Sequence, residues 1–411
     1  MSVRRVGIEK LRAYPGSLVL SMPELCRARG HDLAEIRDVM MIDERSVNPE
    51  WEDPVTMAVN AAKPMLAAED RDRIGLLIVA SESGVDQAKS MTTWVHRYLD
   101  LSPRVRNIEV KHACYGATAA LQLAASWIAS GVAEGETALI INTDQSRMHL
   151  GERWEFVLGA AAVAVLVSAE PRVLEIELGR SGVYTYEVSD LIRPMLDNEV
   201  GNSETSLISY MEALEGAFDD YLCRRPEVDD LSEHFRRIVY HMPFGGMAYR
   251  AHRALLRRSG IFDKEQVWES FSRKVLPSLG YVRRMGTTYG ASTFLGLMAL
   301  AATAADLQAG ERLGIFSYGS GSCSELWSGF VGAQACEVVR DAALPALLDA
   351  RRPLTVAEYE RVEKARAAGL TSTNFATDLG ALGDWYDRYY AGKGLLVFRG
   401  VSECYRQYEW S

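Results

Sequence analysis

The sequence predicts an α/β fold assembled from two similar halves. Three short apolar runs, Ile74–Ala80, Glu136–Asn142 and Ala161–Val167, have the continuous hydrophobicity of strands that are covered on both faces. Longer segments with a helical pattern lie between these runs. The same alternation returns in the second half of the chain, and strands that alternate with helices are typical of a sheet flanked by helices.

The expected elements follow one another in a regular order. In the first half, the expected helices are Pro54–Leu66, Lys89–Leu99 and Tyr115–Ala129. In the second half we expect a strand with its exit, then a helix and a further strand, at Arg236–Phe244, Met247–Gly260 and Leu313–Gly319. A last helix is expected in TVAEYERVEKARAAG, after residue 340.

Two pairs of matching segments indicate an internal duplication. The first half contains CYGATAAL from Cys114 and GETALIINTD from Gly135, and the second contains TYGASTFL from Thr288 and GERLGIFSYG from Gly310. The second copy lies 174 to 175 residues after the first. A matched order at a nearly constant offset favours duplication over chance. Only the first copy carries a thiol, which points to chemistry more than to packing.

Composition and charge exclude several classes of function. The formal net charge of -10 argues against a general nucleic-acid binder, and any anionic partner must therefore meet a local basic patch. No apolar run reaches the roughly 18 residues that span a bilayer, and the N-terminus shows no signal peptide. The six cysteines are far apart and form no CxxC pair. We therefore expect a cytoplasmic protein without disulfides, without a metal site and without membrane contact.

Cys114 is the candidate nucleophile. It opens a helix of small residues, where unpaired N–H groups and the positive end of the helix dipole favour the thiolate. The alternative is a buried, inert cysteine.

Two further residues are candidates for acid–base chemistry. His241 follows an apolar strand that Pro243 ends, and Glu82 comes directly after the strand Ile74–Ala80. The carboxyl edge of such strands is the usual place for catalytic groups in α/β folds. The competitors are His112, two residues before the cysteine, and Asp86, four residues after the glutamate.

A glycine-rich segment, FSYGSGSC at Phe316–Cys323, follows a strand. It lacks the spacing of a phosphate-binding loop. The alternative is a tight turn that presents a backbone N–H group to an oxyanion.

Taken together, these pieces resemble the 3-hydroxy-3-methylglutaryl-CoA synthases of the thiolase superfamily. The motifs occur in family order at family spacing, and GKGLLVFRGVSECYRQYEWS resembles the closing strand of the family. Within the family the chain looks most like the branch that installs β-branches on polyketides bound to acyl carrier proteins. The motifs that carry the resemblance are ASESGVDQAKS, HACYGATAAL, YHMPFGGMAYRAH and FSYGSGSCSELWSG.

The resemblance implies a role for each candidate. Cys114 would take an acetyl group from a donor acetyl-carrier protein, and Glu82 would remove a proton from the acetyl methyl group. The carbanion would attack the β-ketone of an acceptor carrier-protein thioester, which His241 polarises. Water would then release the product from the cysteine. The N–H groups of Cys114 and Ser320 would form the oxyanion hole. Further residues expected to bind substrate are Gly319, Thr287, Tyr289, Pro243 and Phe244.

Two departures from the family pattern bear on the substrate. Thr287 stands where the family usually has asparagine, so its part in polarising the acceptor carbonyl is open. Gly245 and Gly246 stand near the place where members that use CoA tend to carry a lysine. Loss of that cation favours a carrier protein, whose phosphopantetheine arm would be part of the substrate, with no cofactor bound to the enzyme itself.

A basic stripe offers a docking patch for an acidic carrier protein. Arg250, Arg253 and Arg257 follow the spacing i, i+3, i+7 and share one helix face. Such a stripe can steer an acidic partner. The alternative is an ordinary solvated face.

Three other functions stay open. They are a mevalonate-type synthase that uses acetyl-CoA and acetoacetyl-CoA, a non-catalytic scaffold that binds carrier proteins, and an initiation-type ketosynthase. Gly246 counts against the first, the intact Cys114, Glu82 and His241 against the second, and the SESG motif against the third. The acceptor polyketide, the choice between acetyl and propionyl donors and the particular carrier proteins are not predicted.

The duplication and the resemblance together predict a five-layer αβαβα core. The first half would comprise residues 1–170 and the second residues 171–411, with a helical insertion at about 184–230. Members of this superfamily are typically dimers, so a homodimer is expected.

Overall fold

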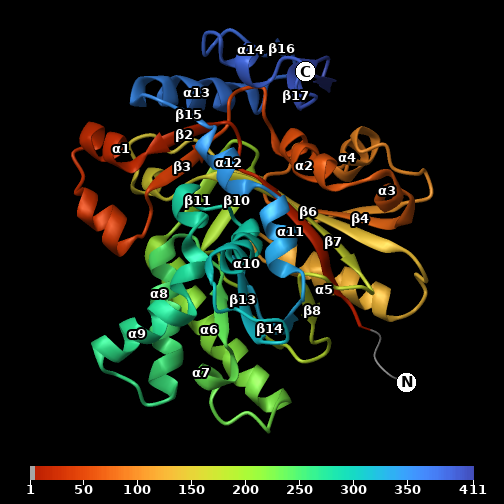
Figure 1. The fold of residues 1–411 in the computed structure, drawn as a ribbon. Coiled ribbons are helices and arrows are strands. Elements are labelled where there is room, and N and C mark those ends of the chain that lie inside the picture. The colour runs from red at the N-terminus through yellow and green to blue at the C-terminus, as the bar shows by residue number, and fades with distance from the viewer. Residues whose placement is uncertain (1–4) are drawn as a thin grey trace.

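The computed structural model describes residues 5–411 and shows two sets of strands joined into one mixed sheet (Figure 1). The first four residues, which begin the N-terminal segment considered above, lie outside the described residues. No helix within residues 5–411 is long and apolar enough to cross a membrane.

The first half-sheet has the order β5-β4-β6-β7-β1. β4 pairs in parallel with β5 and β6, whereas β7 runs antiparallel to β6 and β1. The bounds of these strands are β1 (Gly7–Tyr14), β4 (Ile74–Ala80), β5 (Arg106–Val110), β6 (Thr137–Gln145) and β7 (Ala160–Ser168).

The second half-sheet repeats part of this arrangement. β12 pairs in parallel with β13, and β14 runs antiparallel to β13. The short strand β8 bonds to both β14 and β1 and so joins the two half-sheets. The bounds are β8 (Leu174–Ile176), β9 (Gly182–Thr185), β12 (Arg237–Tyr240), β13 (Arg312–Gly319) and β14 (Cys323–Val331).

Two apolar helices form the layer between the half-sheets. α5 (Gly116–Ala129) contacts β4, β6 and β7, and α10 (Ala291–Thr303) contacts strands of both halves. Both are rich in small, fully buried residues, such as Ala117, Ala120 and Ala124 of α5, which let the layers approach closely. These helices stand at matching places in the two copies, as the duplication predicts.

Helices also cover the outer faces, which gives the five predicted layers. The outer face of the first half is covered by α2 (Pro54–Ala62), α3 (Ala68–Arg73) and α4 (Thr92–Tyr98). On the second half lie α6 (Ser203–Arg224), α7 (Leu231–His234), α8 (Gly245–Arg258) and α9 (Lys264–Lys274), grouped at one end of the molecule (Figure 1).

The remaining segments form smaller units. β2, β3 and β15 form a three-stranded sheet, and β16, β17 and β18 another at the C-terminal end (Figure 1). The closing segment is thus two strands and not one. The bounds are β2 (Leu18–Ser21), α1 (Met22–Arg29), β3 (Glu44–Val47), α11 (Ala335–Asp341), α12 (Leu344–Asp349), β15 (Arg352–Pro353), α13 (Val356–Gly369), β16 (Phe375–Ala376), α14 (Trp385–Tyr389), β17 (Leu396–Ser402) and β18 (Tyr405–Trp410).

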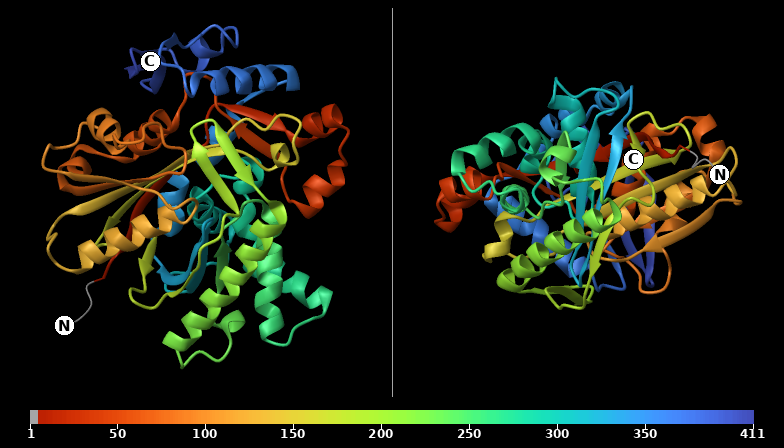
Figure 2. Two further views of the ribbon diagram at one scale, coloured as in Figure 1. Left: turned by 180° about the vertical axis from the view of Figure 1, so that it is seen from behind. Right: turned by 90° about the horizontal axis from the view of Figure 1, so that it is seen from below.

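Two expected elements differ from those in the structure. The helix expected from Lys89 begins at Thr92, because the Asp86 carboxylate accepts hydrogen bonds from the N–H groups of Ala88 and Lys89 and holds a turn there. The insertion expected to be helical also contains a hairpin, β10 (Leu191–Met195) with β11 (Asn198–Gly201), which pairs only with itself among the described strands. Figure 2 shows this hairpin (left view, yellow-green) in front of the central layer.

Candidate active site

Cys114 and Glu82 meet at the carboxyl edge of the first half-sheet. The Cys114 Sγ atom lies 3.3 Å from Glu82 Oε2 in hydrogen-bonding geometry. Glu82 follows β4, and Cys114 lies in the turn that leads from β5 into α5. The two predicted residues therefore come together because parallel strands end at the same edge of the sheet.

The state of the thiol differs from the sequence-based expectation. Burial, and next the negative charge of Glu82, raise the pKa of Cys114 well above its ordinary value. The helix start therefore does not leave a resting thiolate, and a base must take the proton before the sulfur can attack. Glu82 is the group in contact that can do so.

The Glu82 carboxyl group has the properties of a base. Burial raises its pKa to about 7, while the cation of Arg193 opposes that rise. Its backbone N–H donates to Asp144 Oδ1 at 2.9 Å. The same Asp144 oxygen accepts hydrogen bonds from the hydroxyl groups of Ser81 and Ser83, which fixes the loop after β4. The competitor Asp86 is exposed, and its carboxylate accepts hydrogen bonds in the turn described above.

Arg193 was missed by the sequence reasoning. Its Nη1 donates to the Glu82 carbonyl oxygen at 2.8 Å, and its Nη2 lies 3.7 Å from Glu82 Oε1 and donates to the Tyr289 hydroxyl at 3.2 Å. Arg193 lies in β10 of the hairpin, within a segment that was expected to be helical. Asp144 was also missed, although it ends a buried strand, the same signal that selected Glu82.

His241 is buried, with 2% of its surface exposed, at the end of β12. Its Nδ1 atom lies 2.9 Å from the hydroxyl oxygen of Ser292, and that oxygen also accepts the N–H of Met242 at 3.2 Å. The Ser292 hydroxyl can donate its proton to Nδ1, and in that tautomer the ring carries its own proton on Nε2. Burial lowers the pKa of His241 to about 3, so the ring is neutral.

The glycine-rich turn after β13 packs closely against the turn that contains Cys114. A Cβ atom on Gly319 would lie 2.6 Å from both the His112 carbonyl oxygen and the Tyr115 nitrogen, so only glycine fits. Ser320 follows at the half-exposed tip, and the next residue, Gly321, donates its N–H to Asp190 Oδ1 at 3.0 Å. The oxyanion role of Ser320 stays a prediction.

The remaining predicted residues fall in two places. Tyr289 is buried beside the Cys114 turn, where a Cβ on the adjacent Gly290 would lie 2.8 Å from the Cys114 carbonyl oxygen. Thr287 is buried too, and its N–H donates to the Val157 carbonyl oxygen at 2.7 Å. Pro243 and Phe244 are half-buried at the start of α8. The competitor His112 packs its ring edge-on against that of Tyr115.

The arginine stripe borders a groove of about 370 Å³ between α6 and α8. Leu207, Met211 and Ala254 supply apolar lining. Arg250, Arg253 and Arg257 are exposed, and none has an ion-pair partner within residues 5–411. The neighbouring Arg258, by contrast, pairs with Asp219.

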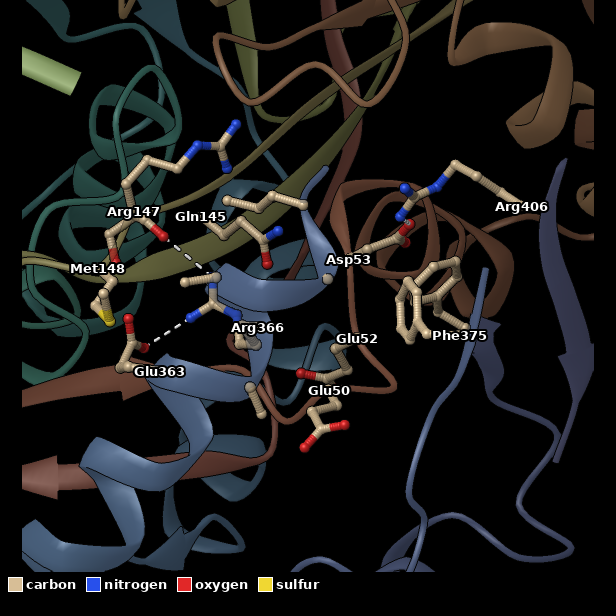
Figure 3. A pocket seen from close by; sticks show the side chains of 16 residues that line it. Glu50, Glu52, Asp53, Gln145, Arg147, Met148, Glu363, Arg366, Phe375 and Arg406 are labelled. Atoms are coloured by element: carbon tan, nitrogen blue, oxygen red, sulfur yellow. Dashed lines mark hydrogen bonds and ion pairs between the residues drawn. The ribbon is translucent and has the colours of Figure 1, made fainter. Parts of the chain in front are cut away.

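A smaller cavity of about 50 Å³ lies elsewhere, between the end of β6 and the C-terminal segments (Figure 3). Arg366 crosses it, donating to Glu363 at 2.7 Å and to the Ser146 carbonyl oxygen at 3.0 Å. Neither Cys114 nor His241 contributes to its wall. This cavity is therefore separate from the site around Cys114.

Comparison with known proteins identifies the family. The N-terminal hydroxymethylglutaryl-coenzyme A synthase family matches residues 4–171, and the C-terminal family matches residues 262–382. The chain belongs to the hydroxymethylglutaryl-coenzyme A synthase family, with the thiolase-like fold of its structures.

The relatives include a synthase named for acyl carrier protein and a synthase named for CoA. The polyketide biosynthesis 3-hydroxy-3-methylglutaryl-ACP synthase PksG of Bacillus subtilis is 38% identical over 98% of this chain and 99% of its own. The hydroxymethylglutaryl-CoA synthase of Enterococcus faecalis is 31% identical over 86% and 90%. The crystal structure of the HMG synthase of the curacin biosynthetic pathway matches with a TM-score of 0.94 at 39% identity, covering 99% of this chain and 100% of that one. The same synthase has been solved in complex with a holo donor-ACP.

Proposed function

We propose that this chain is a hydroxymethylglutaryl-acyl carrier protein synthase that adds an acetyl-derived carbon unit to the β-ketone of a polyketide intermediate. The observation that carries the proposal is the contact between the Cys114 thiol and the Glu82 carboxyl group, with a neutral His241 buried in the second half. The similarity to PksG and to the curacin pathway synthase supports a carrier protein as the source of both substrates.

The reaction begins with acyl transfer. Glu82 takes the thiol proton, and Cys114 Sγ attacks the carbonyl carbon of the acetyl thioester on the donor carrier protein. The bond from that carbon to the sulfur of the phosphopantetheine arm breaks, and the arm leaves as a thiol with the proton. The arm belongs to the substrate, so the enzyme needs no cofactor of its own for this step.

Condensation and hydrolysis follow. Glu82 removes a proton from the methyl group of the acetyl-Cys114 thioester, and the resulting carbanion attacks the ketone carbon of the acceptor. The Nε2–H group of His241 polarises the ketone and passes its proton to the developing alkoxide. The proton that Glu82 removed from the methyl group then returns through solvent to the ring, which restores both residues. Water then cleaves the bond between the acyl carbon and Cys114 Sγ, which gives a carboxylate and restores the thiol.

The start of α8 and the groove beside it favour carrier proteins over free CoA as substrates. A Cβ atom on Gly246 would lie 2.1 Å from the Val39 carbonyl oxygen, and one on Gly245 would lie 2.8 Å from the Met41 side chain. A lysine side chain has no room at either position. The free arginines of the groove between α6 and α8 instead match an acidic protein surface, and we propose this groove as the docking site of the carrier proteins.

The enzyme is proposed to work as a cytoplasmic homodimer. The edge strand β5 has one neighbour, β4, within the described sheet, and its Ile108 is 50% exposed. An unpaired edge with an exposed apolar side chain is suited to pairing with a second copy. Sedimentation of wild type and Ile108→Lys tests this, and a dimer that the substitution leaves intact places the interface elsewhere.

Intact-protein mass spectrometry tests the function. Wild type, Cys114→Ala and the exposed-cysteine control Cys223→Ala are mixed with acetyl-carrier protein or, separately, with acetyl-CoA. We expect an adduct of about 42 Da from the carrier protein in wild type and in the control, and none in Cys114→Ala. Equal labelling by acetyl-CoA would indicate a mevalonate-type synthase, and no adduct from either donor would leave a non-catalytic scaffold.

A further inference from the structure

A continuous chain of polar contacts leads from the protein surface to Glu82 through the hairpin. The exposed Glu152 meets His149 Nδ1 at 2.8 Å, and His149 Nε2 meets Glu199 Oε1 at 3.0 Å. The other Glu199 oxygen pairs with Arg193 Nε. Arg193 in turn contacts the carbonyl oxygen and carboxylate of Glu82.

The hairpin depends on these contacts for its position. β10 and β11 pair only with one another among the described strands, and an isolated two-stranded hairpin is marginally stable. Its outer face is open, with Ile192, Met195 and Val200 exposed by 45%, 61% and 51%. The inward side chains Arg193 and Glu199 are nearly buried, with 11% and 6% of their side chains exposed. Polar contacts of these two residues therefore do much of the anchoring.

His149 is placed to fix Glu199. Its ring faces two carboxylates, Glu152 from its own loop and Glu199 from the hairpin, and the hydrogen bond to Glu199 is the main cause that raises the His149 pKa above its ordinary value. An imidazolium ring donates through both nitrogens and so satisfies both carboxylates at once. Held in this way, Glu199 presents its second oxygen to Arg193.

We propose that His149 and Glu199 are positioning residues that hold Arg193 against Glu82 and thereby keep a cation beside the base during turnover. The inference rests on the proposed function, because it assigns Glu82 as the base. Neither His149 nor Glu199 touches the reacting atoms. They act through Arg193.

The consequence is electrostatic. The charged and titratable groups around Glu82 are Arg193 and Glu199 from the hairpin, Asp144 from β6, the Cys114 thiol and the Tyr289 phenol. Arg193 is the one cation among them, and it opposes the rise in the Glu82 pKa that burial causes. If Arg193 moves away, the Glu82 pKa rises further, and the base is protonated over a wider range of pH.

The test is the pH profile of condensation in a single turnover, started from enzyme already acetylated at Cys114. Wild type is compared with His149→Leu and Glu199→Gln. We expect the acid limb of His149→Leu, the part of the profile where the rate rises with pH, to move up by about one pH unit, which is roughly a tenfold loss of rate on that limb. In Glu199→Gln the limb moves up less, because the Glu199 charge that itself raises the Glu82 pKa is lost at the same time. The position of a limb is independent of the fraction of folded enzyme, so partial unfolding does not imitate the effect.

Two further variants serve as controls. His149→Gln keeps a donor toward Glu199 and should restore most of the wild-type limb. Glu212→Gln removes a carboxylate from the same insertion that accepts a hydrogen bond from the Tyr184 hydroxyl, and it should leave the limb in place. Limbs that coincide in wild type, His149→Leu and Glu199→Gln would overturn the inference, as would an equal shift in Glu212→Gln. Failure of the proposed function would be seen earlier, as wild type that cannot be acetylated at all.

Discussion

Burial raises the pKa of Glu82 and the charge of Arg193 lowers it, and the resulting pKa predicts the pH dependence of the enzyme. Burial raises its pKa to about 7, so the carboxyl group is largely protonated below that pH and ionised above it. The base must be ionised to act. We expect the condensation rate to rise with pH up to about 7 and to level off above it, as measured in single turnovers of acetylated enzyme.

The corresponding variant is Glu82→Gln. An amide keeps the size of the side chain but cannot take a proton, so condensation should slow by about 10² to 10⁴-fold. Asp86→Asn, in the exposed turn nearby, should keep the wild-type profile. A profile of Glu82→Gln that retained the limb near pH 7 would assign that limb to another group.

Ser292 is the hydrogen-bond partner of His241 Nδ1. When the Ser292 hydroxyl donates to Nδ1, the ring proton lies on Nε2 and that N–H group is left for the acceptor ketone. Ser292→Ala should therefore slow condensation by about tenfold or more while Cys114 acetylation stays near wild type. Ser292→Thr keeps the hydroxyl and should retain most of the activity. Equal losses in both half-reactions of Ser292→Ala would indicate general damage to the site.

At the scale of elements, the groove between α6 and α8 allows carrier-protein binding to be altered without altering the reaction at Cys114. Arg253→Glu reverses an unpaired charge on its rim, and we expect about a tenfold loss in kcat/KM for acetyl-carrier protein, mostly through a higher KM. Acetyl-pantetheine, which lacks the protein surface, should react equally with both enzymes. Arg340→Glu on α11 makes the same charge change away from the groove and should have little effect. Loss of activity toward both donors in Arg253→Glu would contradict a docking role.

The two copies of the duplicated unit contribute different residues to the site around Cys114. α5 and α10 both lie in the central layer, but α5 is preceded by Cys114 and α10 by Thr288 and Tyr289. The second copy thus contributes the wall of the site, including the phenol that Arg193 contacts. The first copy thus carries the Cys114 thiol, and residues of the second copy lie beside it.

At the scale of the whole molecule, local patterns predicted β4, β6, β7, β12 and β13 and the meeting of Cys114 with Glu82, because strand ends and helix starts are visible in the sequence. β4 has the expected bounds, and Cys114 and Glu82 meet as their places at strand ends require. Arg193 could not be found this way, since its place depends on how a hairpin packs across the chain. The high pKa of Cys114 was also missed, because burial is a property of the folded molecule.

The ends of the chain are joined by a buried carboxyl group with its own pH dependence. Glu52 Oε1 accepts hydrogen bonds from the hydroxyl groups of Tyr14 in β1 and Tyr390 after α14, at 2.5 and 2.6 Å. Burial raises the Glu52 pKa to about 7 despite these bonds. The group links the first strand to the C-terminal segment.

This shift predicts that Glu52 makes the fold less stable as the pH rises. Below about pH 4.5 the carboxyl group is protonated in both the folded and the unfolded chain, so it adds no pH dependence. Between that value and about 7 the unfolded chain releases the proton and the folded chain keeps it, which lowers the free energy of unfolding by on the order of 3 kcal/mol in total. Glu52→Gln removes this loss and still offers an oxygen to both phenols.

Urea unfolding of wild type and Glu52→Gln at pH 5 and pH 8 measures the effect. The difference in free energy of unfolding between the two proteins should move in favour of the variant by up to about 3 kcal/mol from pH 5 to pH 8. Glu269→Gln, an exposed carboxyl group on α9, should show no such change between the two pH values. A Glu52→Gln difference that is constant with pH would mean that Glu52 is already ionised in the folded protein at pH 5, held so by the two phenols and the charge of Arg366.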